Sequence, residues 1–229
     1  MQRSSRASAS VVHEAASDIV RSVDDAARAE LEADVKRRLE ANDVRGAATA
    51  ALRGYGREIF GFLIAIHRSE QDAADVFSTF SEDLWKGLPK FAWSCTLRAW
   101  SYTLARNASY RWRRRAKNKG EVPFDSSGPL ADVAQQVRTE TRSWLKTEQK
   151  DRFAAIRATL PEEDQTLLIL RVDRGLAWED LAQVMLGEEK PLDEATLKKE
   201  SARLRKRFQL VKEKLVELGK KSGLIKPKE

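Results

Sequence analysis

The segment from Arg106 to Lys119, RNASYRWRRRAKNK, has the composition of a binding site for a polyanion. It holds seven Lys and Arg side chains and no acidic one, and Tyr110 and Trp112 stand among its arginines. Cations neutralise phosphates, and aromatic rings offer faces on which unpaired bases stack. The alternative is a solvated basic helix end, but about one or two cations satisfy the dipole at a helix C-terminus. The segment is therefore predicted to bind nucleic acid.

Aromatic residues also stand in the loop that precedes this basic helix. Phe91 and Trp93 follow Lys90, and Ser94 comes next. Aromatic rings beside a helix N-terminus are suited to holding an extruded base or a phosphate. Each ring is equally suited to a hydrophobic core. Trp100 falls on the apolar stripe of the following helix and is expected to be buried.

The C-terminal part of the chain is predicted to form a second basic surface on a long helix from about Asp193. Its apolar seam, in heptad order, consists of Leu197, Ser201, Leu204, Phe208, Val211, Leu215 and Leu218. Cations lie outside the seam at Lys198, Lys199, Arg203, Arg205, Lys206 and Arg207. In a helix-turn-helix, the first turns of the second helix meet base edges and later cations hold phosphates. Base contacts are therefore expected from Glu194, Thr196, Lys198 and Lys199. A coiled-coil dimer is the alternative use of the seam.

The helix predicted over residues 69–88 carries acids rather than a basic face. They are Asp72, Asp75, Glu82 and Asp83. Acids do not favour DNA, so this surface is expected to face solvent, which is the commoner case, or a protein partner.

The sequence predicts no enzyme chemistry, no cofactor and no metal. It shows no Gly-rich phosphate loop and no supported set of Ser, His and acid, and Cys95, His13 and His67 do not have metal-ligand spacing. The longest apolar run, residues 60–66, is shorter than the roughly 20 residues of a membrane-spanning helix. A lone cysteine fits a reducing compartment. A cytoplasmic protein without membrane insertion is expected.

The apolar pattern predicts an all-α protein with two helical domains. Hydrophobic residues make up 41% of the 229 residues, the net charge is +7, and alternating strand patterns are absent. Residues 1–17 are expected to be disordered. The expected divisions are a helical bundle at 18–117 with an extra N-terminal helix, a linker at 118–135, a helix-turn-helix domain at 136–220 and a basic tail at 221–229.

Several stretches together resemble the extracytoplasmic-function sigma factors of the sigma-70 family. VKRRLEANDVRGAATAALRGYGREIFGFL and DAADVFSTFSEDLW resemble the start of sigma region 2, and TLRAWSYTLARNASYRWRRR resembles the part that melts and reads the minus-10 element. LPEEDQTLLILRVDRGLAWEDLA resembles sigma region 4. The resemblance covers about Val35 to Leu218 and rests on the order of these stretches.

The resemblance implies a non-enzymatic specificity subunit whose partners are core RNA polymerase, promoter DNA and a possible anti-sigma factor. The implied polymerase contacts are Asp72, Asp75, Glu82 and Asp83. The implied minus-10 contacts are Phe91, Trp93, Ser94, Arg98, Arg106, Asn107, Tyr110, Arg111, Arg113 and Arg114. The implied minus-35 contacts are Thr196, Lys198, Lys199, Arg203 and Arg205.

The chain departs from the family pattern at four places. Ser78 and Thr79 replace a Gln-acid pair, and Ala177 replaces a Ser or Thr that caps a helix. The turn is longer because LGEEKPLDEA precedes Thr196, and Glu200 stands where a cation is common. The rival interpretations are a dimeric helix-turn-helix regulator of duplex DNA and a helical module that holds RNA or protein without sequence preference.

Overall fold

The computed structural model describes residues 25–117, 128–145, 154–188 and 192–222, and these ranges contain helices and no strand. The expected all-α class is thereby confirmed. The expected disordered N-terminus and basic tail lie largely or wholly outside the described residues. Within the described ranges, no helix is long and apolar enough to cross a membrane.

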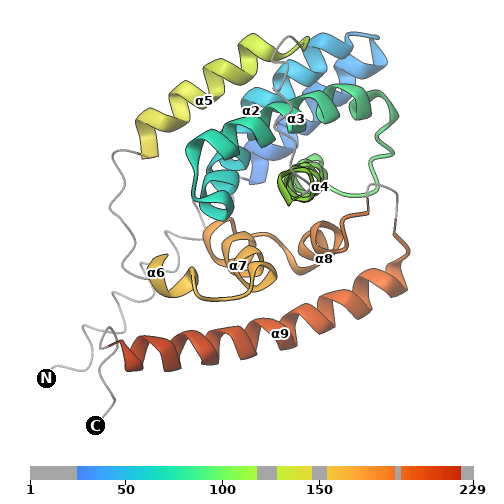
Figure 1. The fold of residues 1–229 in the computed structure, drawn as a ribbon. Helices are drawn as coiled ribbons and strands as arrows, with labels where there is room; N and C mark the ends of the chain where they lie inside the picture. The colour runs from blue at the N-terminus through green and yellow to red at the C-terminus, as the bar shows by residue number, and fades with distance from the viewer. Residues whose placement is uncertain (1–24, 118–127, 146–153, 189–191, 223–229) are drawn as a thin grey trace, which may run out of the picture.

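The first bundle consists of a helix at residues 25–40 and three longer helices. These are α2 (Val44–His67), α3 (Glu70–Gly87) and α4 (Leu97–Lys117), with a short 3-10 turn at Leu88–Lys90 between α3 and α4. The apolar periodicity predicted all four helices. In Figure 1, α4 is seen almost end-on, with α2 and α3 above it.

Side-chain caps fix where three of these helices begin. Asp43 accepts a hydrogen bond from the Gly46 backbone N–H at 2.8 Å, and Ser69 accepts one from the Asp72 N–H at 3.2 Å. Thr96 does the same for the Ala99 N–H at 3.1 Å. Each cap satisfies a backbone donor that the first helical turn leaves unpaired. The expected caps Ser69 and Thr96 are confirmed.

Two glycines in α2 allow neighbouring helices to approach its backbone. A Cβ on Gly54 would lie 2.1 Å from Leu31 of the first helix, and one on Gly56 would lie 2.9 Å from Val137. Real Cβ atoms do not approach other atoms this closely, so Leu31 or Val137 would have to shift to admit a side chain here. The glycines thus offset their cost in helix propensity by close packing.

Helix α5 (Ala131–Leu145) packs against α2 and α3 of the first bundle. Arg138 of α5 donates to Ser78 Oγ at 2.9 Å and to the Ala74 carbonyl at 3.3 Å. The expected boundary at residue 136 falls inside this helix. The two-domain division itself stays a prediction.

The remaining helices make up the C-terminal part of the chain, where the second domain is predicted. They are α6 (Ala154–Arg157), α7 (Glu162–Leu168), a π-helical turn at Ile169–Asp173, α8 (Trp178–Leu186) and α9 (Glu194–Lys221). Helices α8 and α9 form the expected helix-turn-helix. Ala177 supplies no side-chain cap to α8, as its residue type predicts. Asp173 is not a substitute cap, because it pairs with Arg157 at 2.8 Å.

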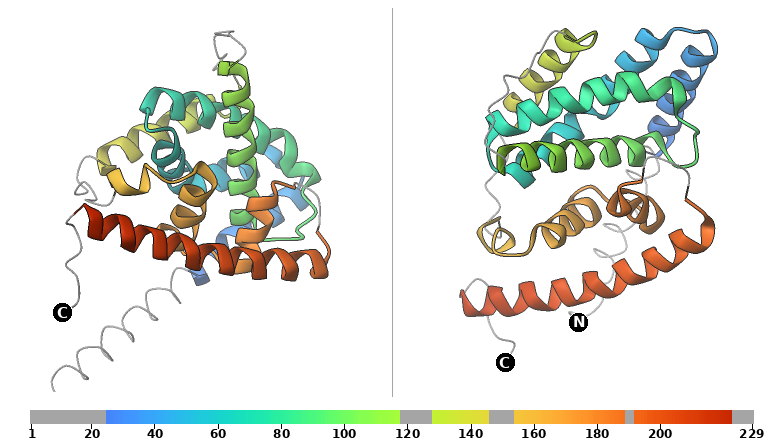
Figure 2. Two further views of the ribbon diagram at one scale, coloured as in Figure 1. Left: turned by 60° about the horizontal axis from the view of Figure 1, so that its bottom comes forward. Right: turned by 45° about the vertical axis from the view of Figure 1, so that its right-hand side comes forward.

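Helices α7 and α8 lie between the first bundle and α9 (Figures 1 and 2). Helix α8 contacts α4 on one side and α9 on the other. One continuous cluster of buried apolar residues includes Leu104 of α4, Leu181 of α8 and Leu204 of α9. The predicted second domain therefore shares one continuous core with the first bundle.

The heptad seam of α9 is packed within the chain. Ser201, Leu204 and Val211 are buried, and Phe208, Leu215 and Leu218 are partly buried against Leu160 and Leu168. A coiled-coil dimer would need this seam for a second copy. The fold thus favours the intramolecular use of the seam.

Leu204 and Leu210 on α9 provide a matched pair for testing this packing. Leu204 is fully buried, whereas Leu210 is 66% exposed. Leu204→Ala is expected to lower the free energy of unfolding by about 2–5 kcal/mol, and Leu210→Ala to change it by less than about 0.5 kcal/mol. Urea denaturation at two protein concentrations measures both. A stability that rises with protein concentration would contradict the intramolecular seam.

Candidate nucleic-acid interface

The basic end of α4 is anchored to the first bundle by its aromatic and charged residues. The Trp112 ring meets the His67 ring edge-on with centroids 5.1 Å apart, and His67 Nε2 lies 2.8 Å from Ser109 Oγ. Arg111 forms an ion pair with Asp83 of α3. Tyr110 and Arg114 are exposed. The segment therefore combines a fixed inner face with an outer face open to solvent.

The aromatic loop before α4 is folded onto the bundle. Phe91 is only 9% exposed and stacks on Trp100, with ring centroids 4.6 Å apart and planes 22° apart. Trp93 is partly exposed and has a φ of 56°, which is a strained value for a large side chain. Ser94 is exposed. The expectation that Trp100 is buried is confirmed, and Phe91 shares its environment.

Arg98, one of the expected DNA contacts, is buried in an ion pair. Its guanidinium donates to both carboxylate oxygens of Glu58 at 2.8 Å and to the Arg174 carbonyl at 2.7 Å. Burial by itself would lower the pKa of Arg98, but the hydrogen bonds and charge of Glu58 outweigh it and raise the pKa. Arg98 therefore remains charged and links α4 to α2 and to the second domain.

Three more of the expected contacts on α4 face the second domain. Arg106 Nη1 donates to the Val184 carbonyl at 3.4 Å, and Asn107 Nδ2 donates to the Gly187 carbonyl at 3.0 Å. Arg113 forms an ion pair with Glu162. Burial lowers the pKa of both Arg106 and Arg113.

The first turns of α9 carry the expected second contact surface. Asp193 caps the helix by accepting the Thr196 N–H at 2.9 Å and also accepts the Thr196 hydroxyl at 2.6 Å. Lys198 pairs with Glu194, and Lys199 is exposed. The order of these side chains along the first turns suits contact with a duplex groove.

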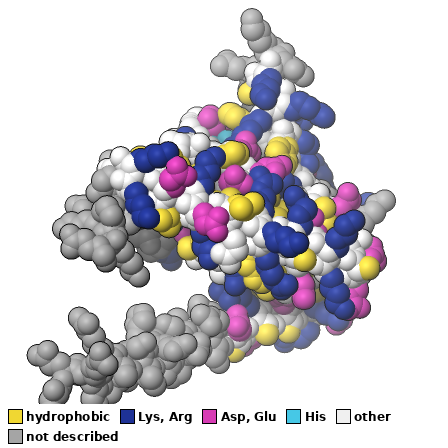
Figure 3. All heavy atoms as spheres, turned by 90° about the horizontal axis from the view of Figure 1, so that it is seen from below, with side chains coloured by type: hydrophobic (Ala, Val, Ile, Leu, Met, Phe, Trp, Pro, Cys, Tyr) yellow, Lys and Arg dark blue, Asp and Glu magenta, His cyan; other side chains and the backbone are white. Residues whose placement is uncertain are grey.

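Farther along α9, two arginines are held in defined positions. Arg203 is bidentate to Glu200, with distances of 2.8 and 2.6 Å. Arg205 lies over the Trp178 ring, with its Cζ 5.6 Å from the ring centroid. Glu200 stands where the family commonly has a cation. Its side chain is buried and accepts the hydrogen bonds of Arg203. Figure 3 shows Lys and Arg side chains interspersed with acids over the face that α9 crosses.

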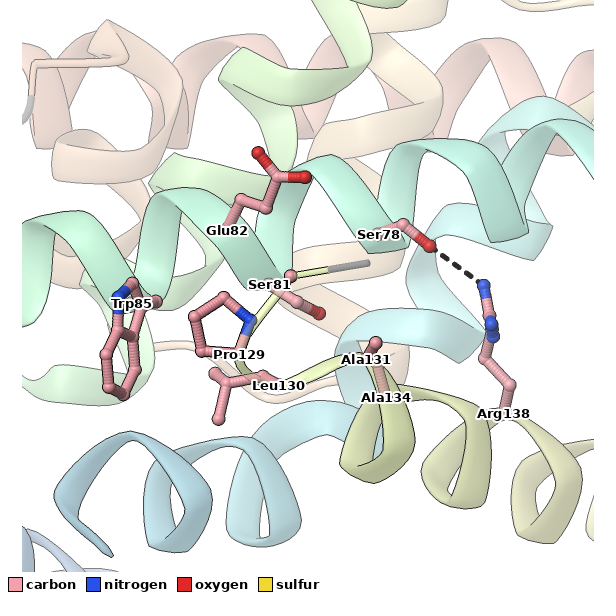
Figure 4. A pocket seen from close by; sticks show the side chains of 10 residues that line it. Ser78, Ser81, Glu82, Trp85, Pro129, Leu130, Ala131, Ala134 and Arg138 are labelled. Carbon is pink, nitrogen blue, oxygen red and sulfur yellow. Dashed lines mark hydrogen bonds between the residues drawn. The ribbon is translucent and has the colours of Figure 1, made fainter. Parts of the chain in front are cut away.

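The acids of α3 lie beside two different elements, since Asp83 pairs with Arg111 of α4 and Glu82 lies beside the start of α5. Asp72, Asp75, Glu82 and Asp83 are all partly exposed. A small pocket beside Glu82 is lined by Trp85, Pro129 and Leu130, and Figure 4 shows Arg138 reaching Ser78 next to it. Burial and the charge of Asp72 raise the pKa of Asp75. Among the described residues, no cluster of His, Cys, Asp or Glu is suited to a metal ion.

The structure adds four residues that sequence reasoning did not single out. Glu58 pairs with Arg98, Glu162 pairs with Arg113, Asp180 accepts from Thr96 at 3.2 Å, and the Arg174 carbonyl accepts from Arg98. These partners lie 40 or more positions apart in the sequence. The spacing of neighbouring residues in the sequence therefore does not predict these pairs.

Comparison with known protein families identifies a domain that contains α4 and the helices packed on it. Residues 51–119 match the sigma-70 region 2 family and thus include most of α2, all of α3 and all of α4. The chain carries a sigma region 2 domain, and it is a distant homologue of bacterial RNA polymerase sigma factors of the extracytoplasmic-function type.

Two curated proteins illustrate the relationship. RNA polymerase sigma factor YlaC of Bacillus subtilis is 27% identical over 145 residues, which cover 58% of this chain and 76% of that protein. RNA polymerase sigma-H factor of Pseudomonas aeruginosa is 25% identical over 156 residues, which cover 65% of this chain and 79% of that protein. The search of solved structures gave no significant match. At the family level, the comparisons support the function of an RNA polymerase sigma factor.

His67 supports a pH-dependent prediction about the anchor of the basic segment. Burial and the charge of Arg113 lower the pKa of His67 to about 4 from an ordinary value near 6.5. Between these values the unfolded chain binds the proton and the folded chain does not, so stability falls as the pH falls from about 6.5 toward 4. The loss between pH 7 and 5 is expected to be about 1 kcal/mol, because the half-buried ring is partly screened.

Denaturation at pH 7 and pH 5 measures this loss for the wild type and for His67→Gln. The variant keeps a polar group near Ser109, but this group does not titrate. The Asp and Glu side chains that titrate in the same pH range are the same in both proteins, so their contribution cancels in the comparison. A smaller pH dependence is expected in the variant. Equal pH dependence in the two proteins would refute the role of His67.

Proposed function

We propose that this protein is an alternative sigma factor that recognises minus-10 and minus-35 promoter elements and helps to melt DNA at the start of transcription. The observation that carries the proposal is the position of the basic segment. It forms the C-terminal half of α4, inside the match to sigma region 2, with exposed Tyr110 and Arg114 beside partly exposed Trp112.

The minus-10 strand is assigned to α4 and the loop before it. Tyr110 accepts a hydrogen bond from Arg106 at 2.7 Å, and the Arg106 guanidinium lies 4.6 Å from the centre of its ring. Asn107, Arg111, Arg113 and Arg114 surround this pair along the helix. The pair offers a stacking face with a cation behind it, a combination that favours unpaired bases. Trp93 and Ser94 lie at the rim of the stacked Phe91 and Trp100 rings, where an extruded base is proposed to sit.

The minus-35 element is assigned to the first half of α9. Thr196, Lys198 and Lys199 occupy the first turns, and Arg203 and Arg205 follow on the exposed side. The Asp193 cap sets the start of the helix, and contacts with α8 set its direction. A helix held in this way can enter a major groove with its N-terminal residues on base edges.

The polymerase contact is assigned to the acids Asp72, Asp75, Glu82 and Asp83 of α3. All four keep part of their surface exposed, and cations of α4 and α5 lie nearby. The proposed activity takes place with the polymerase in the cytoplasm. An anti-sigma partner is an expectation from the family resemblance and stays a prediction.

A dimeric regulator of duplex DNA is less well supported. Its dimer would use the α9 seam, which contacts other helices of the same chain. That regulator also gives no purpose to a sigma region 2 domain.

The direct test adds the purified protein to sigma-free core RNA polymerase with fragmented genomic DNA and sequences the 5′ ends of the transcripts. Discrete start sites that share two spaced upstream elements are expected. A shared element at only one position would reject two-element recognition. The absence of discrete start sites would reject the sigma assignment.

Arg114 offers a sharper test of the minus-10 assignment, because it is exposed and its removal leaves the anchoring contacts of α4 intact. Arg114→Ala is expected to reduce open-complex formation roughly fivefold, which corresponds to about 1 kcal/mol of lost phosphate contact. Permanganate footprinting of the melted strand measures the effect.

Arg53→Ala is the matched control, because Arg53 is an exposed arginine on α2 outside the proposed site. Both variants are expected to bind core polymerase as tightly as the wild type. Equal losses of open complexes in the two variants would contradict a specific role for Arg114.

A further inference from the structure

Helix α5 lies along α3, beside two of the acids assigned to the polymerase contact. Just before α5, a Cβ on Gly128 would lie 3.5 Å from Cγ of Glu82, so this end of the segment lies against Glu82. Farther along the helix, the charge of Arg138 partly offsets the rise in the pKa of Asp75 that burial and the charge of Asp72 cause. The acids proposed to face the polymerase therefore have α5 as their neighbour.

We infer that α5 is a fixed part of the surface that docks on core RNA polymerase, so that α3 and α5 bind the polymerase together. The inference rests on the proposed function, since it extends the surface assigned there to α3. Helix α5 lies outside residues 51–119, which match sigma region 2. The α3–α5 face is defined here by Glu82 and Trp85 of α3, Pro129 before α5, and Gln135 and Arg138 of α5.

The packing of α5 favours a permanent position over a detachable one. Its inner side chains Leu130, Ala134 and Val137 are buried and belong to the same continuous apolar cluster as the buried side chains of α2 and α3. A Cβ on Gly56 of α2 would lie 2.9 Å from Cγ1 of Val137, so α2 has no side chain where α5 approaches. Removal of α5 would expose this apolar surface to water, which is unfavourable. The helix is therefore expected to stay in place when a partner binds.

Arg138 attaches α5 to the middle of α3. Its guanidinium donates to Ser78 Oγ at 2.9 Å and to the Ala74 carbonyl at 3.3 Å. The family pattern has a Gln at the position of Ser78, and that longer side chain would occupy the place of the guanidinium. A cation from α5 thus lies where the family presents a side chain of α3 itself. This exchange changes which helix meets a partner at this point.

The pocket between α3 and the start of α5 indicates which side chains of a partner fit the face. Trp85 and Pro129 line one end of it beside the Glu82 carboxylate, and Arg138 lies at the other end (Figure 4). A carboxylate next to an aromatic ring suits a Lys or Arg side chain, whose charge pairs with the acid while its stem lies on the ring. Glu82 pairs with Lys86 at 3.1 Å, but exposed pairs of this kind are weak and easily exchanged. A basic segment of the polymerase is therefore the expected partner.

Two neighbouring glutamines on α5 allow a matched test of this face. Gln135 accepts a hydrogen bond from Arg138 and so lies on the side of the helix toward α3. Gln136 donates to Glu140 at 3.0 Å, and adjacent residues of a helix point about 100° apart. Both glutamines are exposed, so a Trp at either position adds the same bulk without disturbing the core.

The affinity for core polymerase is measured by competition with wild type labelled at its N-terminus. Gln135→Trp is expected to bind about tenfold more weakly than the wild type, because its ring takes space that the partner needs in a closely packed interface. Gln136→Trp is expected to bind within about twofold of the wild type. Urea denaturation is expected to give both variants the stability of the wild type. Equal affinities of the two variants, whether high or low, would reject the α3–α5 face.

A disulfide between α5 and α2 tests whether the helix stays in place. The approach of Val137 to Gly56 brings the two Cβ positions within disulfide reach, so Gly56→Cys with Val137→Cys locks α5. The pair is introduced with Cys95→Ser, which removes the chain's one natural cysteine. The oxidised protein is expected to bind core polymerase as tightly as the same protein after reduction. Binding that is lost on oxidation and restored by a reductant would show that α5 has to leave, and would overturn the inference.

Transcription by the wild type with core polymerase separates failure of this inference from failure of the proposed function. If the wild type gives discrete start sites but Gln135→Trp and Gln136→Trp bind core polymerase equally well, the role of α5 is rejected and the sigma assignment stands. If the wild type neither binds core polymerase nor gives discrete start sites, the proposed function is rejected and the inference with it.

Discussion

The buried ion pair between Arg98 and Glu58 is the interaction on which the arrangement of this protein depends. A charge taken out of water must be paired, and Arg98 satisfies this requirement with two bonds to α2 and one to the Arg174 carbonyl. Loss of Glu58 would leave a buried charge between α4 and the second domain. The pair therefore fixes α4 against α2 at the point where the second domain also docks.

From this anchor, α4 presents residues with different surroundings along its length. Near its start, Phe91 and Trp100 stack beneath a strained Trp93, so the loop before the helix has a defined shape. Near its end, Trp112 packs on His67, and the side chains beyond it are exposed. The packing of Trp112 on His67 fixes the position of the helix end, and the exposed side chains beyond it remain accessible to a ligand. Sites that act on a strand of DNA need both properties.

The cations of α4 show how one set of side chains can serve two purposes. Guanidinium groups donate hydrogen bonds to helix-terminal carbonyls as well as to carboxylates and phosphates, which they bind more strongly. Arg106 and Arg113 satisfy this preference within the chain, through Val184 and Glu162. Two cations of the basic surface are thereby paired within the chain.

The sequence by itself determined the all-α class, the positions of the main helices and two of their caps, because these depend on local periodicity and on hydrogen bonds within one turn. It also identified the basic segment of α4 and the burial of Trp100. The tertiary structure alone showed that Arg98 and Arg106 are buried, that α5 lies on α2 and α3, and that the α9 seam is filled within the chain. An exposed and a buried arginine look alike in a sequence. Only the packing of distant segments decides which of them meets water and which meets a partner 40 or more residues away.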